Sequence, residues 1–118
     1  MSGEGQALLA ALEEALKGQA RLGRPIGYLA LAGRLARPGP QRIHRLTHAL
    51  EVLVRRDHAA GRPLLAALAV GRSGIPGRGF FQLLRELGRH QGADQGAAAA
   101  DCHARELAAA LAYWPERD

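Results

Sequence analysis

The chain has 118 residues, 47% of them hydrophobic, which excludes a wholly disordered protein and allows one domain with a buried core. Cys102 is its only cysteine, so an intramolecular disulfide is excluded and a reducing, cytoplasmic compartment is expected. No apolar run approaches the roughly 20 residues that span a bilayer, and the first residues lack signal-peptide character, so we expect no membrane partner.

The formal charge of +5 is distributed unevenly along the chain. Residues 21–62 sum to +7 and residues 63–92 to +3, whereas residues 1–20 sum to −2 and residues 93–118 to −3. Clustered positive charge between acidic flanks is typical of a protein that binds a polyanion. A hydrated basic surface without a ligand gives the same signal, so the charge alone leaves both interpretations open.

A first helix is predicted over residues 5–20. Its apolar stripe consists of Leu8, Leu9, Leu12, Ala15 and Leu16, with Glu13, Glu14 and Lys17 on the other side. Gly18 or Gly23 is expected to end this helix, because glycine is the preferred residue just beyond a helix C-terminus. The helix either packs in the core or forms a homodimer contact.

The central stretch is predicted as an extended piece, a short helix, a turn and a long helix. Pro25 disfavours helical geometry in Arg24, so residues 24–27 are expected to be extended. A short helix follows over residues 28–36, and Pro38 and Pro40 flank Gly39 in the turn. Residues 40–61 then carry an apolar helical stripe formed by Ile43, Leu46, Leu50, Leu53 and Val54.

Residues 62–114 are predicted to begin with a strand and a loop and to end with two helices. The apolar run of residues 64–70 lies between Pro63 and Gly71 and is predicted as a buried strand. Residues 71–81 form a Gly-rich basic loop, and a third helix is expected over residues 80–88. A break at residues 90–96 precedes a last helix over residues 97–114, a second candidate for a homodimer interface.

The central pattern resembles the winged-helix group over about residues 26–81. The resemblance rests on Tyr28-x-x-x-Ala32, the Gly/Pro turn, the second helix with its Leu-rich face, and the strand with its Gly-rich basic loop. It implies a mainly α fold with a small β-hairpin, a winged helix-turn-helix with extra N- and C-terminal helices. The single domain, residues 1–118, would hold the helix-turn-helix at about 26–61 and the wing at about 62–79.

In that group the first of the two helices supports the second, which enters the major groove, and this defines the expected DNA-binding residues. Arginine suits guanine edges and glutamine suits adenine edges in that groove. The set predicted to face the groove is Gln41, Arg42, His44, Arg45 and His48; Arg34 and Arg37 would contact flanking phosphates, and Arg72 and Arg78 would do so from the wing.

The expected function is therefore a small DNA-binding protein, a bacterial or phage-type transcriptional regulator that binds double-stranded DNA. The alternative is a winged-helix protein–protein interaction module that presents the same basic helix to an acidic protein partner. Structured RNA is a weaker third candidate, because no exposed aromatic platform for stacking bases is evident.

The sequence carries no motif that indicates an enzyme, a cofactor or a metal site. A P-loop needs Lys and then a hydroxyl residue directly after its second Gly, whereas here Gly79 is followed by Phe80. His44 and His48 have the spacing of paired metal ligands, but Arg45 stands where a metalloprotease motif needs Glu. We interpret Cys102 as a small core residue rather than a reactive thiol.

Overall fold

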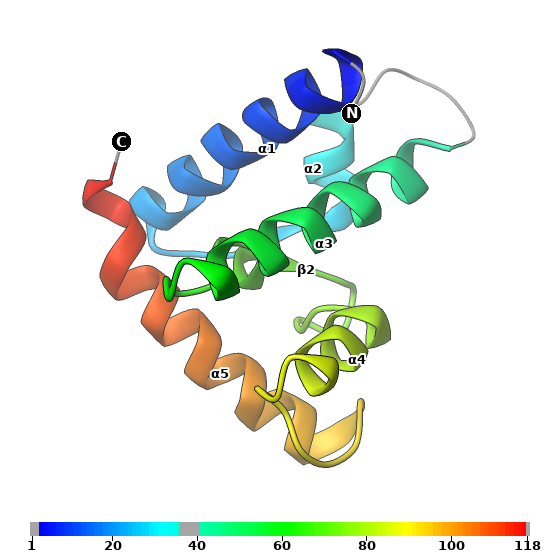
Figure 1. Ribbon diagram of the computed structural model, residues 1–118, viewed down its shortest axis with the longest axis vertical. Helices are drawn as coiled ribbons and strands as arrows, with labels where there is room; N and C mark the ends of the chain where they lie inside the picture. Colours follow the sequence, from blue (N-terminus) through cyan, green and yellow to red (C-terminus); the bar gives the residue numbers. More distant parts are fainter. Residues whose placement is uncertain (1–2, 36–40, 118) are drawn as a thin grey trace.

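Helix α1, Gly3–Leu22, begins the described part of the chain, which comprises residues 3–35 and 41–117 of the computed structural model (Figure 1). Leu12 and Leu16 are fully buried, as the apolar stripe predicts. The helix ends at Gly23, where φ is 76° and the amide of Arg24 donates to the Gln19 carbonyl. Of the two predicted stops, Gly18 lies within the helix and Gly23 ends it, because glycine adopts this left-handed geometry without steric cost.

The prediction that Lys17 lies on the polar, exposed side of α1 is wrong. Its side chain is buried, with Nζ 3.0 Å from a carboxylate oxygen of Glu13 and 5.6 Å from the ring centroid of Trp114. A buried ammonium needs a partner charge, and the aromatic ring face adds a favourable electrostatic contact. Trp114 lies almost a hundred residues away in sequence, so helical periodicity could not reveal this environment.

The central elements agree with the sequence pattern. Strand β1, Ile26–Gly27, leads directly into helix α2, Tyr28–Leu35, and helix α3 spans Arg42–Ala59. The predicted stripe of α3 is buried except for Ile43, which is 38% exposed. Gly61, with φ at 71°, follows the end of the helix, and the Arg62 amide donates to the Asp57 carbonyl.

The apolar run of residues 64–70 is not a continuous strand. It forms a 3₁₀ turn, η1, over Leu65–Leu68, followed by strand β2, Ala69–Val70, and all of it is buried. Side chains satisfy part of its backbone: Asp57 Oδ2 accepts from the Leu65 amide at 3.1 Å, and Trp114 Nε1 donates to the Pro63 carbonyl at 2.9 Å. Because these partners replace a strand ladder, the segment need not be extended.

The small sheet is parallel, and the predicted β-hairpin is wrong. Strand β1 pairs with β2, with Ile26 opposite Ala69 and Gly27 opposite Val70. Residues 62–79 therefore contain no hairpin wing. Instead the Gly-rich loop folds back on itself, because the Gly71 amide donates to the Ile75 carbonyl at 2.9 Å and Gly74 adopts a φ of 88°.

The C-terminal half supplies helix α4, Arg78–Glu86, helix α5, Gly96–Tyr113, and a 3₁₀ turn η2, Trp114–Glu116. In Figure 1, α3 runs through the middle of the molecule between α1 and α4, and α5 runs along one side. Cys102 is buried in the core as predicted. The prediction of a mainly α fold is confirmed, and no helix in the described ranges is long and apolar enough to cross a membrane.

Candidate nucleic-acid interface

The first turns of α3 expose a cluster of basic and polar side chains, which we call the basic face. It consists of Gln41, Arg42, His44, Arg45 and His48. All are exposed except Arg42, which is half-buried. Within residues 3–35 and 41–117, none of these side chains takes part in a hydrogen bond or an ion pair. The structure therefore places these five predicted site residues on one exposed helix end.

The start of α3 has a positive electrostatic character that nothing on the helix offsets. Its first turn contains no acidic residue, and Gln41 at the N-cap makes no side-chain capping bond. The unpaired amides and the helix dipole place a partial positive charge at this end, and Arg42 and Arg45 add full charges to it. Such an arrangement disfavours the isolated helix and favours a bound anion.

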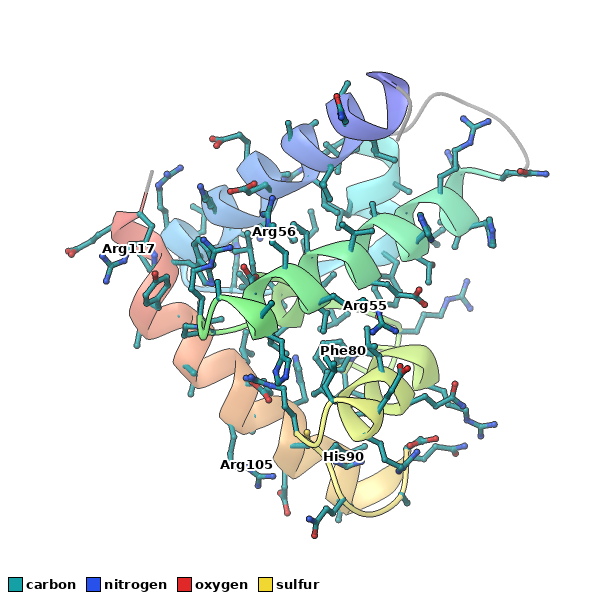
Figure 2. The ribbon with its side chains drawn as sticks, in the orientation of Figure 1. Arg55, Arg56, Phe80, His90, Arg105 and Arg117 are labelled. Carbon is teal, nitrogen blue, oxygen red and sulfur yellow. The ribbon has the colours of Figure 1, made fainter. Side chains whose placement is uncertain are left out.

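The second half of α3 differs, because its arginines have partners. Arg55 lies 3.0 Å from Glu86 of α4, and Arg56 lies 2.8 Å from Glu13 of α1. Figure 2 shows the two side chains leaving α3 on opposite sides, toward α4 and α1. No DNA contact was predicted for this half of α3. Its two arginines join α3 to α4 and α1.

The four arginines predicted to contact flanking phosphates do not share one environment. Arg34 is exposed, but its Nη1 donates to Gln19 Oε1 at 3.3 Å, and Arg37 lies outside the described residues. Arg72 is exposed in the turn after β2, and Arg78 is the exposed first residue of α4. Neither Arg72 nor Arg78 is carried by a hairpin, so their predicted place on a wing is wrong.

The structure does bring the start of α4 next to α3. Gly77 and Gly79, on either side of Arg78, line the same pocket as Thr47 and Glu51 of α3. Arg78 itself does not line this pocket. Arg72 lies in the loop that Tyr28 supports, since the Gly77 amide donates to the Tyr28 hydroxyl at 2.8 Å.

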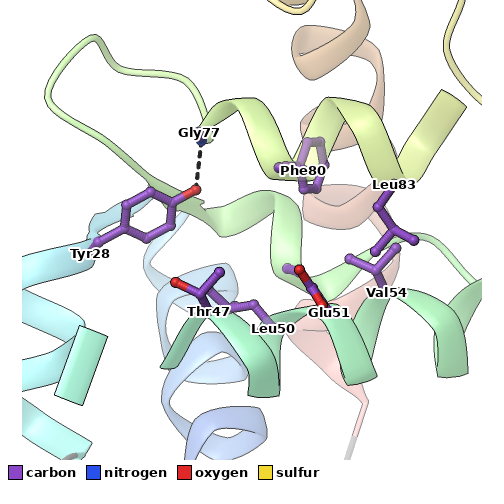
Figure 3. A pocket seen from close by; sticks show the side chains of 10 residues that line it. Tyr28, Thr47, Leu50, Glu51, Val54, Gly77, Phe80 and Leu83 are labelled. Atoms are coloured by element: carbon purple, nitrogen blue, oxygen red, sulfur yellow. Dashed lines mark hydrogen bonds between the residues drawn. The ribbon is translucent and has the colours of Figure 1, made fainter. Parts of the chain in front are cut away.

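The pocket between α3 and α4 is a feature that the sequence analysis did not identify (Figure 3). Its volume is about 130 Å³, and its apolar lining comes from Leu50, Val54, Ala66, Phe80 and Leu83. Tyr28, Thr47 and Glu51 contribute polar groups. The sequence signal was weak: Thr47 and Glu51 lie one turn apart beside the apolar stripe, and nothing indicated that Gly77 would approach Tyr28.

Four of the five histidines fall into two groups, and His58 is half-buried with Nδ1 3.3 Å from Arg89 Nη1. His44 and His48 are exposed on α3, whereas His90 and His103 are buried and bond to the carbonyls of Ala93 and Ala67. No group of three or more His, Cys, Asp or Glu side chains in the described part of the chain is arranged to hold a metal ion. Burial raises the pKa of the Cys102 thiol, which disfavours the reactive thiolate.

Comparisons with known proteins add no family assignment. No family model matches the chain, and neither the curated proteins nor the solved structures give a significant match.

Proposed function

We propose that this chain is a DNA-binding protein, a transcriptional regulator of bacterial or phage type, in which α2 and α3 act as a helix-turn-helix. In this proposal the basic face enters the major groove. Arginine and glutamine there read base edges, and Arg34, Arg37, Arg72 and Arg78 contact phosphates on either side. The loop of residues 71–77 and the start of α4 take the place that a wing has in winged-helix proteins.

One observation carries the proposal: the cations of the basic face have no partner among the described residues, while those at the other end of the same helix do. Arginines that serve only solubility can lie anywhere on a surface. Here Arg42 and Arg45 lie at the helix end where the dipole makes a cation unfavourable. A polyanionic ligand removes that cost, since phosphates neutralise both the side chains and the helix end.

The test is binding of the purified protein to random-sequence duplex DNA at several salt concentrations. On random-sequence DNA the basic-face arginines meet phosphates instead of a selected base sequence, which brings the phosphate contacts to about six. The logarithm of the association constant should then fall with the logarithm of salt concentration at a slope of roughly −5. In an Arg42→Ala/Arg45→Ala variant the slope should weaken by about 2, and affinity at low salt should fall by at least about tenfold.

The same helix offers a matched control. An Arg55→Ala/Arg56→Ala variant removes the same charge from α3, but both arginines are already paired with carboxylates. We expect it to bind DNA within about threefold of the unmodified protein. Equal losses in the two double variants would show that total charge, rather than the basic face, determines binding. Absence of DNA binding at low salt would contradict the proposal and favour an acidic protein partner.

A further inference from the structure

We propose that the pocket between α3 and α4 binds a small primary amine carried on a single aromatic ring. The ring would lie among Leu50, Val54 and Leu83, and the ammonium group would pair with Glu51 (Figure 3). This site is separate from the basic face, and the inference does not depend on DNA binding.

The size and lining of the pocket determine the body of the ligand. A volume of about 130 Å³ is close to that of apolar protein cavities, about 150 Å³, that accept benzene. Leu50, Val54 and Leu83 provide aliphatic walls, and Phe80 adds an aromatic one. Such walls favour one flat apolar ring, whereas drug-sized ligands are typically bound in pockets of about 300 Å³ or more.

The polar groups determine the functional group of the ligand. Glu51 is exposed at the pocket, and its carboxylate forms no ion pair or hydrogen bond with the residues that the structure describes. Arg55, one turn after Glu51 on α3, is already paired with Glu86, so Glu51 is the carboxylate at the pocket that can select a cation. A carboxylate facing a pocket repels an anionic ligand and attracts an ammonium group.

The remaining polar atoms of the pocket belong to uncharged groups, so Glu51 provides the only charge toward that ammonium among the described residues of the lining. The Thr47 hydroxyl donates to the Ile43 carbonyl at 2.9 Å, and the Tyr28 hydroxyl accepts from the Gly77 amide at 2.8 Å. Burial raises the pKa of Tyr28, although the Gly77 amide lowers it, so the phenol keeps its proton. Tyr28 therefore presents an O–H donor, which suits a ligand acceptor and does not suit a second ammonium.

The experiment uses benzylamine as the probe and follows the methyl groups of Thr47, Leu50, Val54 and Leu83 by NMR, without DNA. We expect saturable shifts confined to these methyls with a dissociation constant in the millimolar range, since a ligand of this size has few atoms in contact. Benzyl alcohol, which has the same shape without the charge, should bind roughly fivefold more weakly, and phenylacetate should not bind.

Two variants test the role of the carboxylate. Glu51→Gln keeps the shape of the side chain and should weaken benzylamine binding roughly fivefold while leaving benzyl alcohol unaffected. Glu14→Gln is the matched control, because Glu14 is exposed on α1 and lines no part of this pocket, and it should not change either affinity. The proposal would be overturned by the absence of saturable shifts at the pocket methyls, or by equal benzylamine affinity in the Glu51→Gln variant.

Discussion

The two ends of α3 have similar compositions and opposite environments. Arg42 and Arg45 project from the first two turns without partners in the described structure, whereas Arg55 and Arg56 reach carboxylates on α4 and α1. Asp57 then lies fully buried between the helix and the η1 segment that follows it. The same residue type thus contributes to packing at one end of the helix and remains available for a ligand at the other.

The difference shows why a basic helix by itself is poor evidence for a binding function. The helix dipole favours cations near the C-terminus and disfavours them near the N-terminus. Arg55 and Arg56 therefore have a sufficient structural explanation, and Arg42 and Arg45 have none within the described fold. Charges that lack a structural explanation are the better candidates for function.

The largest expected effect comes from removing the buried acid at the end of α3. Asp57→Ala removes the acceptor of the Leu65 amide and the partner of Arg62, whose Nη2 lies 3.0 Å from Asp57 Oδ1. We expect the free energy of unfolding, measured in urea, to fall by about 2–4 kcal/mol. Glu51→Ala, an exposed acid on the same helix, should change it by less than about 0.5 kcal/mol. A loss below about 1 kcal/mol for Asp57→Ala would mean that the Leu65 amide is satisfied without it.

A smaller effect is expected for Arg56→Gln, which should lower the free energy of unfolding by about 0.5–1 kcal/mol because the pair with Glu13 is only partly exposed. Although partial burial raises the pKa of Glu13, hydrogen bonds from Lys17 and Arg56 outweigh it, and the pKa lies below its ordinary value of 4.5. A lowered acid pKa stabilises the fold above 4.5, and this contribution is lost as pH falls through the lowered value.

The difference between the unmodified protein and Arg56→Gln should therefore shrink as pH is lowered from about 6 to about 3. Arg55→Gln is the control, since both members of its pair are more than half exposed and the change should stay below about 0.5 kcal/mol. A difference that does not vary with pH would indicate that packing of the Arg56 side-chain stem, rather than its charge, is responsible.

The smallest effect should have the opposite sign. Arg42→Glu places an acid at the start of α3 and should raise the free energy of unfolding by about 0.3–1 kcal/mol, while it weakens DNA binding. Arg55→Glu, near the other end, should lower it by a similar amount, because it removes the pair with Glu86 and opposes the dipole. Thermal unfolding of the two variants side by side measures both signs, and a destabilised Arg42→Glu would show that Arg42 has a structural role.

Local patterns in the sequence predicted the helices well, because apolar spacing and the glycines at positions 23 and 61 act within a few residues. The prediction failed where distant residues decide the structure. The run of residues 64–70 reads as a strand until Asp57 and Trp114 are placed beside its backbone. A hairpin was expected from two segments that are neighbours in the sequence. The actual partner of β2 is β1, which is separated from it in the sequence by α2 and α3.

The candidate site also has one part that local sequence patterns predict and another that depends on contacts between distant residues. Helical periodicity and the resemblance to the winged-helix group together identified the basic face, whose five residues lie at one helix end. The pocket could not be predicted, because it requires Tyr28, the start of α4 and the side of α3 to meet. The sequence also could not show which arginines of α3 form ion pairs, because the partners Glu13 and Glu86 lie on other helices.

The buried segment of residues 64–70 has a consequence for how the protein unfolds. Its backbone is held by Asp57 of α3 and by His103 of α5 through the Ala67 carbonyl, and Trp114 of η2 donates to the carbonyl of Pro63, directly before the segment. None of these elements can separate from the others without exposing unpaired polar groups of the segment. We therefore expect α3, α5 and η2 to be lost in a single cooperative event, although each helix alone could fray from its ends.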